Sequence, residues 1–469
     1  MSYIVGSIPG EREGIVHFRD GFLWGAATAS YQIEGAVNED GRAPSIWDTF
    51  SHTPGKVLHG DTGDIACGHY HRLEEDLDLM ADLGLQAYRF SVAWPRIQPD
   101  GSGAVNQRGL DFYRRLVDGL RERSIEPMLT LYHWDLPQAL EDTGGWTNRE
   151  TSERFADYAG IVYEALSASV GFWITLNEPW VAAWLGHGYG LHAPGHRESG
   201  KALAATHHLL LGHGLAMRAM RETGRDNQLG VTMNLHPALP GRDRDADREA
   251  ARCVDGQANR LYLDPVFRGS YPEDLISFYE NRGVNPPPVR DGDLETISIP
   301  VDFLGVNYYF RHTVRDAPDQ EPSQEPFSDL AVRGIVPHAA EKTAMGWPVD
   351  PEGLTQMLVR IKEEYGDPPI YVTENGRAVH DYVDPEGGVD DEERISYLDA
   401  HFRAAHAAME RGVDLRGYMV WSLLDNFEWA EGYSKRFGLV YVDYPTGKRI
   451  PKASAGWYAG VIRDNGLET

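Results

Sequence analysis

Short runs of β-branched and aromatic residues recur along the chain, separated by longer stretches in which apolar residues return every three or four positions. Runs of the first kind are typical of strands, and the second spacing is typical of amphipathic helices. The pattern predicts eight strands, at 22–28, 87–92, 127–132, 172–176, 228–234, 303–308, 370–373 and 418–422. The helices predicted between them include 72–83, 109–123, 150–166, 353–364 and 391–411.

The order of these elements indicates the fold. Strands that alternate with helices form parallel sheets; periodicity alone allows an open sheet, but eight strands favour a closed barrel. We therefore predict an α/β fold, a (β/α)8 TIM barrel with extended βα loops. Two stretches rich in Pro, Asp and Glu, 316–327 and 381–391, are expected to be surface loops because the alternation resumes after both. Residues 1–469 are predicted to form a single domain.

Charge and cysteine content narrow the class of partner. The chain has 71 acidic and 44 basic residues and a net charge of −27, which repels nucleic acid and anionic membrane surfaces. Two cysteines cannot build a disulfide framework, and no Cys/His cluster has zinc spacing. The absence of a secretory signal and of a long apolar run predicts a cytoplasmic protein. Nothing in the sequence indicates an oligomeric state.

Polar and aromatic side chains gather where the predicted strands end. In a (β/α)8 barrel, the carboxyl ends of the strands and the loops that follow them carry the chemistry. The fifth predicted strand is followed by Asn234 and His236, to which the sequence assigns no role. The other strands lead into a set of residues typical of a binding site: Gln32, Arg89, His133, Trp134, Asn177, Glu178, Asn307, Tyr309, Glu374, Trp421, Glu428 and Trp429.

Two glutamates in this set form a candidate catalytic pair. A lone glutamate at a strand end is more often a salt-bridge or capping group, but hydrolysis of a glycosidic bond takes two carboxyl groups. One of them must be protonated and the other ionised, so their surroundings are expected to differ. Glu178 and Glu374 follow two different strands. Arg89 is the candidate cation that keeps Glu374 ionised; an ordinary ion pair inside the barrel is the alternative for it.

The tryptophans favour a carbohydrate as the substrate. A sugar ring presents apolar C–H faces and a belt of hydroxyls, so its site combines aromatic platforms with side chains that donate and accept hydrogen bonds. Trp24 also fits simple core packing, and His133 taken alone is more often a structural histidine. The tryptophans at or near the predicted strand ends are Trp24, Trp134, Trp347, Trp421 and Trp429.

Seven motifs, in a fixed order, carry a family resemblance. They are the signature Phe22-x-Trp24-Gly25 through Gln32-x-Glu34-Gly35, Tyr88-Arg89-Phe90-Ser91, His133-Trp134-Asp135-Leu136-Pro137, Asn177-Glu178-Pro179, Asn307-Tyr308-Tyr309, Thr373-Glu374-Asn375-Gly376, and the run from Trp421 to Trp429. From Phe22 to about Trp457 the chain resembles glycoside hydrolase family 1, the β-glucosidase family.

The resemblance implies double displacement with retained configuration, with neither a metal nor an organic cofactor. It implies that Glu178 is the acid/base and Glu374 the nucleophile, with their carboxyl groups about 5–5.5 Å apart. It also implies which residues bind the sugar: Asn177 at the 2-hydroxyl, and Gln32, His133, Glu428 and Trp429 at the 3-, 4- and 6-hydroxyls. Trp421 is expected to stack under the sugar ring, Trp347 to contact the leaving group, and Tyr309 to lie beside the nucleophile. Trp134 and Asn307 are expected to be further binding residues.

Single positions separate subgroups of the family. Members that act on 6-phosphorylated sugars resemble this chain but carry a serine at the position of Glu428, a carboxylate that would repel a phosphate dianion. Thioglucosidases of plants lack the acid/base glutamate, which is present here as Glu178. Many relatives have small residues where this chain has Arg377. Arg377 is expected to face solvent or pair with a loop acid; the alternative is that it lines the leaving-group side.

The predicted function is that of a retaining β-glucosidase. Its expected partners are small substrates, namely cello-oligosaccharides and other glucosides from which it removes terminal non-reducing β-D-glucosyl residues. A broad β-galactosidase or β-fucosidase and a transglycosylase are alternatives, because the same residues serve all three. A non-catalytic sugar-binding barrel is disfavoured because both glutamates are present.

Overall fold

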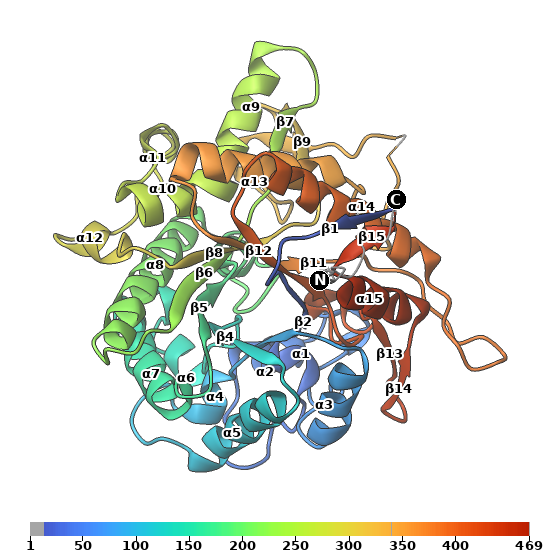
Figure 1. The fold of residues 1–469 in the computed structure, drawn as a ribbon. Helices are drawn as coiled ribbons and strands as arrows, with labels where there is room; N and C mark the ends of the chain where they lie inside the picture. The colour runs from blue at the N-terminus through green and yellow to red at the C-terminus, as the bar shows by residue number, and fades with distance from the viewer. Residues whose placement is uncertain (1–13, 339, 469) are drawn as a thin grey trace, which may run out of the picture.

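A computed structural model describes residues 14–338 and 340–468 and shows a closed barrel of eight parallel strands (Figure 1). Around the barrel the order is β11-β12-β2-β3-β4-β5-β6-β8. Each predicted strand overlaps one of these, which confirms the predicted (β/α)8 fold. The bounds are β2 (Leu23–Ala27), β3 (Ala87–Ser91), β4 (Glu126–Tyr132), β5 (Phe172–Asn177), β6 (Gln228–Asn234), β8 (Phe303–Asn307), β11 (Ile370–Asn375) and β12 (Leu415–Trp421).

Helices cover the outside of the barrel (Figure 1). The five predicted helices are present, each ending within two residues of its predicted bounds: α3 (Leu73–Asp82), α5 (Gln107–Glu122), α7 (Glu150–Leu166), α13 (Pro351–Tyr365) and α14 (Glu392–Glu410). Their apolar spacing has the expected result, since α7 buries Phe155, Tyr158, Val162 and Leu166 along one stripe. The longest helix, α8 (Ser199–Arg221), packs along α7.

Helix ends follow from particular residues. Asp350 precedes α13 and accepts a hydrogen bond from the Gly353 N–H, while Pro351 occupies the first helical position, where no hydrogen-bond donor is needed. The helix stops at Gly366, whose φ of 84° lies in the left-handed region that glycine adopts without strain.

Smaller elements extend the loops. A three-stranded sheet is formed by β10 (Val332–Gly334), β9 (His312–Asp316) and β7 (Ala238–Pro240), a hairpin by β13 (Val440–Asp443) and β14 (Lys448–Pro451), and a pair by β1 (Ile15–His17) and β15 (Gly466–Glu468). The remaining helices are α1 (Ser30–Ile33), α2 (Ile46–Ser51), α4 (Trp94–Ile97), α6 (Gln138–Glu141), α9 (Asp245–Asp255), α10 (Leu261–Arg268), α11 (Glu273–Glu280), α12 (Asp293–Ile297) and α15 (Ala453–Asp464). Two π-helices, η3 (Val181–Gly188) and η4 (Gly256–Arg260), and four 3-10 turns, η1 (Leu58–Gly60), η2 (Gly145–Thr147), η5 (Ser328–Leu330) and η6 (Trp429–Glu431), complete the elements of the described residues.

The two stretches predicted as surface loops are only partly exposed. The first begins within β9 and ends at Phe327, which is 3% exposed. In the second, Tyr382 is 73% exposed, but the side chain of Asp381 is fully buried between Arg394 and Lys452. The acidic composition predicted solvent exposure; ion pairing with buried cations satisfies Asp381 instead.

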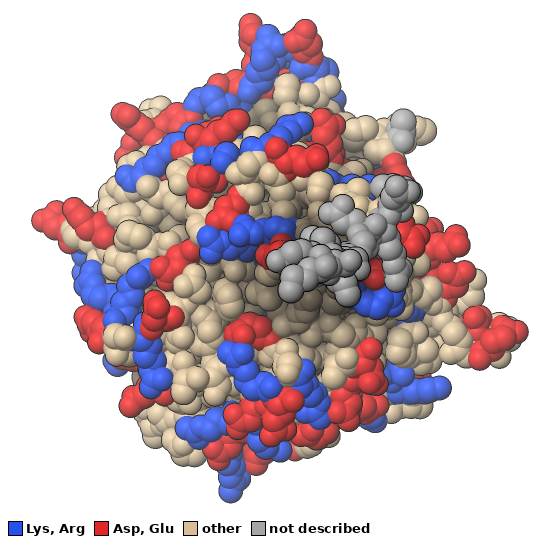
Figure 2. Space-filling view, in the orientation of Figure 1, with Lys and Arg blue, Asp and Glu red and all other residues tan. Residues whose placement is uncertain are grey.

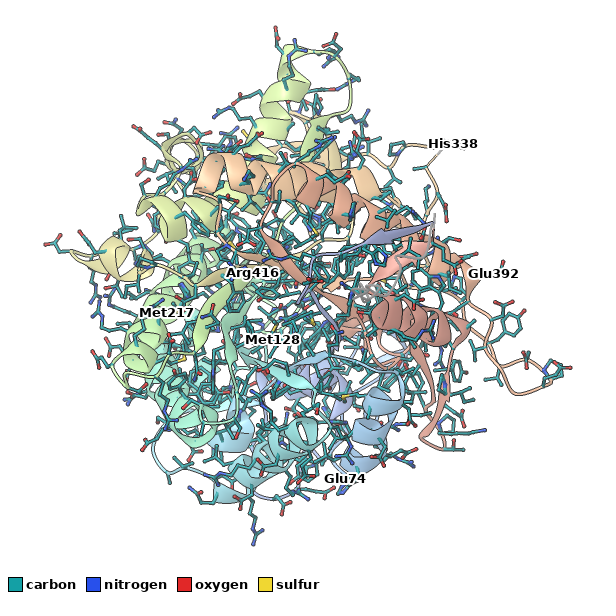
Figure 3. All side chains as sticks on the ribbon, viewed as in Figure 1. Glu74, Met128, Met217, His338, Glu392 and Arg416 are labelled. Atoms are coloured by element: carbon teal, nitrogen blue, oxygen red, sulfur yellow. The ribbon has the colours of Figure 1, made fainter. Side chains whose placement is uncertain are left out.

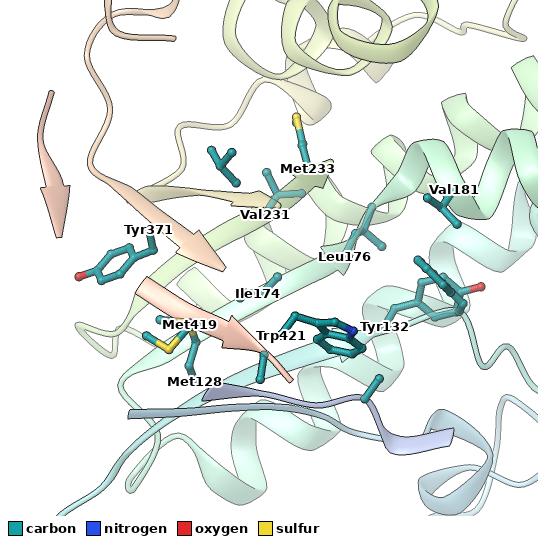
Figure 4. Packing of buried hydrophobic residues seen from close by; sticks show 14 of the residues in the cluster. Met128, Tyr132, Ile174, Leu176, Val181, Val231, Met233, Tyr371, Met419 and Trp421 are labelled. Atoms are coloured by element: carbon teal, nitrogen blue, oxygen red, sulfur yellow. The ribbon is translucent and has the colours of Figure 1, made fainter. Parts of the chain in front are cut away.

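One hydrophobic core runs through the described residues. Figure 4 shows Met128, Ile174, Val231 and Met419, from four barrel strands, within it. Removing such a side chain from water contributes about 1.5–3 kcal/mol per residue. The single domain predicted for residues 1–469 includes positions 1–13, 339 and 469, which lie outside the described residues, so it stays a prediction.

Polar side chains surround this core. In Figure 3, Glu74, His338 and Glu392 lie at the periphery, while Met128 lies near the centre. Acidic and basic residues are interspersed over the face shown in Figure 2 rather than separated into regions of one sign. Among the described residues, no helix is both long enough and apolar enough to cross a membrane.

Candidate active site

A cavity of about 340 Å³ lies where the barrel strands end. Asn234, the last residue of β6, and His236, which follows that strand, had no predicted role but belong to its lining. Nine of the predicted site residues also line it: His133, Trp134, Glu178, Tyr309, Trp347, Glu374, Trp421, Glu428 and Trp429. The fold thus brings together residues that are almost 300 positions apart in sequence, because parallel barrel strands all end at the same rim.

Glu374 lies near the end of β11, between a cation and a phenol. Its Oε1 accepts a hydrogen bond from Nη1 of Arg89 at 2.6 Å, and its Oε2 accepts one from the Tyr309 hydroxyl at 2.9 Å. Burial raises the pKa of Glu374, but the charge and hydrogen bond of Arg89 and the Tyr309 donor oppose that rise. Arg89 is fully buried, so it is the predicted cation, and its ion-pair partner is Glu374.

Glu178 directly follows β5 and has no cation bonded to its carboxyl group in the described structure. Its Oε1 accepts from Nδ2 of Asn307 at 2.6 Å. Burial, and after it the negative charge of Glu374, raise the pKa of Glu178 well above its usual range. As predicted, the surroundings differ: Glu374 loses its proton more readily, and Glu178 holds its proton to higher pH.

Two asparagines connect these carboxylates behind the cavity wall. Oδ1 of Asn177 accepts from Nη2 of Arg89 at 2.6 Å and from Nδ2 of Asn307 at 3.1 Å. Oδ1 of Asn307 accepts from the Thr373 hydroxyl at 2.7 Å. Both asparagines are fully buried, and neither belongs to the cavity lining. They orient the two glutamates, because every hydrogen bond fixes an amide that in turn contacts Arg89 or Glu178.

At the inner end of the cavity, three buried polar atoms, two in its lining and one of Gln32 behind it, have no hydrogen-bond partner among the described residues. They are Nδ1 of His133, Oε1 of Gln32 and Oε2 of Glu428. Nδ2 of Asn177 donates to Nε2 of His133 at 3.0 Å, which places the imidazole proton on Nδ1. Burial also keeps the ring neutral, since it lowers the pKa of His133 well below its usual value. His133 Nδ1 thus offers a donor and Gln32 Oε1 an acceptor to a polar ligand, and the carboxyl group of Glu428, whose pKa burial raises to about 8, can donate or accept.

Aromatic rings surround these polar atoms. The ring of Trp429 lies 4.6 Å from Trp134, and His133 stacks on Trp421 with centroids 5.9 Å apart. On another side, Trp347 lies 5.3 Å from Tyr309. Apolar ring faces beside unpaired polar atoms match the two kinds of surface that a sugar presents.

Several residues of the cavity have an unusual backbone conformation, which is typical of functional sites. Glu178, Trp134 and Trp429 have φ values of 46°, 77° and 50°, a left-handed conformation that costs bulky residues energy and is concentrated at functional sites. A close backbone approach lies next to the nucleophile candidate: a Cβ placed on Gly376 would collide with the Trp421 carbonyl oxygen. Only glycine therefore allows the loop after β11 to lie against the end of β12. The peptide bond between Trp421 and Ser422 is cis.

Some predicted residues lie elsewhere. Trp24 is a core residue, packed on Phe18 and Phe22, and takes no part in the cavity. Gln32 is fully buried and, like Asn177 and Asn307, stands behind the lining; its Nε2 donates to the Phe427 carbonyl at 2.8 Å.

Arg377 is bound on two sides. It is 4% exposed and pairs with Glu341 and, at 2.6 Å, with Glu393. The expected pairing with a loop acid is confirmed by Glu341, and the second partner, Glu393, belongs to α14. The alternative, in which Arg377 lines the leaving-group side, is wrong, because Arg377 is absent from the lining of the cavity.

Sequence reasoning missed the outer wall of the cavity. Its lining comes from segments without a strand-end signal: Trp180, Val181, Leu185, Leu191, His192, Phe310, His312, Pro326 and Met345. Trp180, two positions after Glu178, and Phe310, directly after Tyr309, stood close enough to a motif to be found.

Comparisons with known proteins agree with this geometry. Residues 15–467 match the model of the family described as "Glycosyl hydrolase family 1". Beta-glucosidase A of Thermotoga maritima is 50% identical over 452 residues, covering 96% of this chain and 99% of that protein. A bifunctional beta-D-glucosidase/beta-D-fucosidase of Bifidobacterium breve is 48% identical over 464 residues, covering 96% and 98%. The solved Thermotoga maritima beta-glucosidase in complex with deoxynojirimycin has a TM-score of 0.91 at 50% identity, covering 96% and 100%.

Proposed function

This chain belongs to glycosyl hydrolase family 1 and is a retaining β-glucosidase, and we propose that Glu374 acts as its nucleophile and Glu178 as its acid and base. The observation that carries the assignment of roles is the asymmetry of the pair. Glu374 has the cation Arg89 and the donor Tyr309, whereas among the described residues Glu178 is hydrogen-bonded only by the neutral amide of Asn307. An ionised carboxylate attacks, and a protonated carboxyl group donates.

In the first step, a carboxylate oxygen of Glu374 attacks the anomeric carbon of the bound glucoside. The bond from that carbon to the glycosidic oxygen breaks, and the proton of Glu178 passes to the departing oxygen. The products of this step are the free alcohol and a glucosyl ester of Glu374. Arg89 and Tyr309, which held the carboxylate, stabilise the charge that remains on the nucleophile side.

In the second step, Glu178 acts as the base. Once Glu374 is esterified, it has lost the negative charge that helps to raise the pKa of Glu178. The pKa of Glu178 therefore falls in the intermediate, and the carboxylate left by the first step can accept a proton from water. The resulting hydroxide attacks the anomeric carbon, releases glucose with its original configuration and regenerates both glutamates.

Recognition of the glucosyl group is proposed for the inner end of the cavity. Nδ1 of His133 has a proton to donate, and Oε1 of Gln32 and Oε2 of Glu428 have lone pairs to offer. Trp421 and Trp429 supply ring faces for the C–H surface of the sugar. Lys435, which could otherwise neutralise a phosphate, donates to the Ala344 carbonyl at 3.0 Å. This favours an unphosphorylated sugar.

We further propose that the natural substrates are glucosides and cello-oligosaccharides, cleaved at the non-reducing end. A second activity on β-fucosides is favoured by one relative, the Bifidobacterium breve protein named for both activities. A fucoside differs at the 4- and 6-positions, which the polar groups at the inner end would contact. We also retain a cytoplasmic location as a proposal; cell fractionation tests it.

A panel of nitrophenyl glycosides tests the proposed specificity. Wild-type protein is expected to give its highest kcat/KM on the β-glucoside, a measurable value on the β-fucoside and none on α-glycosides. NMR of fresh product is expected to show the β-anomer of glucose first. An α-anomer as the first product, or turnover that is unchanged in Glu374→Ala, would rule out the retaining mechanism proposed for this pair.

A further inference from the structure

The leaving-group side of the cavity has an apolar wall. Its lining includes Trp180, Val181, Leu185, Leu191, Phe310 and Met345. Val181 and Leu185 belong to η3, whereas Phe310 and Met345 come from the segments after β8 and before α13. Such a wall binds a flat or long apolar group by excluding water from it, and it binds small leaving groups weakly.

A residue outside the lining supports this wall from behind. Phe327 is 3% exposed, and its ring centroid lies 5.6 Å from Trp180 and 4.9 Å from His312, both of which line the cavity. Its neighbour Pro326 lines the cavity directly. Phe327 has a φ of 65°, which a phenylalanine adopts only where its surroundings hold it.

Two residues later in the chain, Asp329 binds three neighbouring elements. Its Oδ1 accepts from the Tyr189 hydroxyl at 2.6 Å, at the end of η3. Its Oδ2 accepts from the Tyr279 hydroxyl of α11 at 2.7 Å and from Nε2 of Gln257 in η4 at 3.1 Å. These partners are all neutral donors, and among the described residues none of the ion pairs includes Asp329. Burial raises the pKa of Asp329, and the hydrogen bonds from these donors oppose that rise.

Tyr189, one of the donors to Asp329, is also hydrogen-bonded to the backbone of Phe327. The Phe327 N–H donates to the hydroxyl oxygen of Tyr189 at 2.9 Å. Tyr189 thus bonds to both ends of the Phe327–Asp329 turn, and the donors around Asp329 fix where Tyr189 stands. A change of acceptor at Asp329 is transmitted to Phe327, and from there to Trp180 and His312, through direct contacts.

We propose that Asp329 is a positioning residue for the leaving-group side: by holding Phe327 behind Trp180 and His312, it determines how tightly the cavity binds apolar aromatic leaving groups. Asp329 itself does not line the cavity. The inference rests on the proposed function, because it concerns the leaving group of the reaction carried out by Glu178 and Glu374. It adds a determinant of leaving-group binding that is remote from the sugar.

The test is the variant Asp329→Asn, which keeps the shape of the side chain but presents an NH2 group to a phenol donor. With 2-naphthyl β-glucoside, kcat/KM is expected to fall about tenfold, mainly through KM, because the wall shifts by a fraction of an ångström. With β-glucosyl fluoride, whose leaving group does not reach the wall, kcat/KM is expected to stay unchanged. The matched control is Glu325→Gln, which removes a charge from an exposed residue of the same loop and is expected to change neither value.

Tyr279→Phe provides a second variant if Asp329→Asn does not fold. It removes one donor from Asp329 and leaves the Tyr189–Phe327 bond in place, so a smaller loss confined to the naphthyl substrate is expected. Equal losses on both substrates, or no loss on either, would overturn the proposal. Failure of the proposed function would look different: wild type and Glu374→Ala would then turn over β-glucosyl fluoride at the same rate.

Discussion

Nη1 of Arg89 lies 2.6 Å from Oε1 of Glu374, and the guanidinium of this pair is fully buried in the barrel. The same guanidinium donates through Nη2 to Asn177, the residue before Glu178. One cation therefore contacts the carboxylate of Glu374 and the side chain of the residue that precedes Glu178. This arrangement favours the ionised form of Glu374, the proposed nucleophile, and fixes its position relative to Glu178, the proposed acid.

Replacing Arg89 is expected to move the acid limb of the pH–rate profile. Activity needs ionised Glu374, and loss of a well-placed cation raises the pKa of that carboxyl group. In Arg89→Lys, kcat/KM is expected to fall on the order of 10²-fold, with the acid limb shifted to higher pH. Arg377→Lys, another buried arginine with two carboxylate partners, is the control and keeps the wild-type profile. An unmoved acid limb in Arg89→Lys would contradict this role.

Tyr309→Phe is expected to shift the profile in the same direction but less. The phenol donates a hydrogen bond to Oε2 of Glu374 without carrying a charge, so its loss also raises the pKa of Glu374 and lowers kcat about tenfold. The ring contact with Trp347 is kept in the variant. The measurement is again the pH–rate profile. A rise in KM with no shift of the acid limb would mean that Tyr309 serves the substrate rather than the nucleophile.

Glu178→Gln is expected to separate good leaving groups from poor ones. An alkyl glucoside needs a proton at the departing oxygen, so its kcat/KM falls roughly 10²- to 10⁴-fold. A dinitrophenyl glucoside leaves without that proton and keeps a kcat/KM close to wild type. The basic limb, which reports deprotonation of Glu178 as pH rises through its raised pKa, is expected to disappear. A loss of the same size on both substrates would argue against general acid catalysis by Glu178.

Gly376→Ala is expected to damage both stability and activity. The added Cβ would collide with the carbonyl oxygen of Trp421, so the loop that follows Glu374 must shift, at about 1–3 kcal/mol of unfolding free energy. Thermal unfolding and kcat measure the two effects. Gly456→Ala in α15, where a Cβ meets nothing within 4 Å, is the control and keeps Tm at or above wild type. A Gly376→Ala variant as stable and active as wild type would show that the two loops are not in close contact.

The fold could be predicted from sequence because its signal is local. The spacing of apolar residues predicts strands such as β6 and helices such as α7. Packing in the barrel buries the residues at that same spacing. The meeting of Glu178 and Glu374 in one cavity could also be predicted, since parallel strands bring their ends to one rim wherever they lie in the sequence.

The rest of the site depends on contacts that local patterns do not encode. Which nitrogen of His133 carries the proton follows from Asn177, 44 positions away. The support of the outer wall follows from Asp329 and Tyr189, 140 positions apart, in segments without periodicity. Residue type can also mislead. Trp24 is one of the tryptophans near the predicted strand ends and Asp381 lies in a predicted surface loop, but tertiary packing places both side chains in the interior.

The most direct test of the central claim is to trap the glycosyl-enzyme. The reagent is 2-deoxy-2-fluoro-β-glucosyl fluoride. Its 2-fluoro group slows both steps, but its good leaving group, fluoride, still allows the first step to proceed, so the covalent intermediate accumulates. Mass spectrometry of the digested protein is predicted to find one fluoroglucosyl group, on the peptide and at the side chain of Glu374. A label on Glu178 or on any other residue, or an unlabelled protein that releases inverted sugar, would contradict the account.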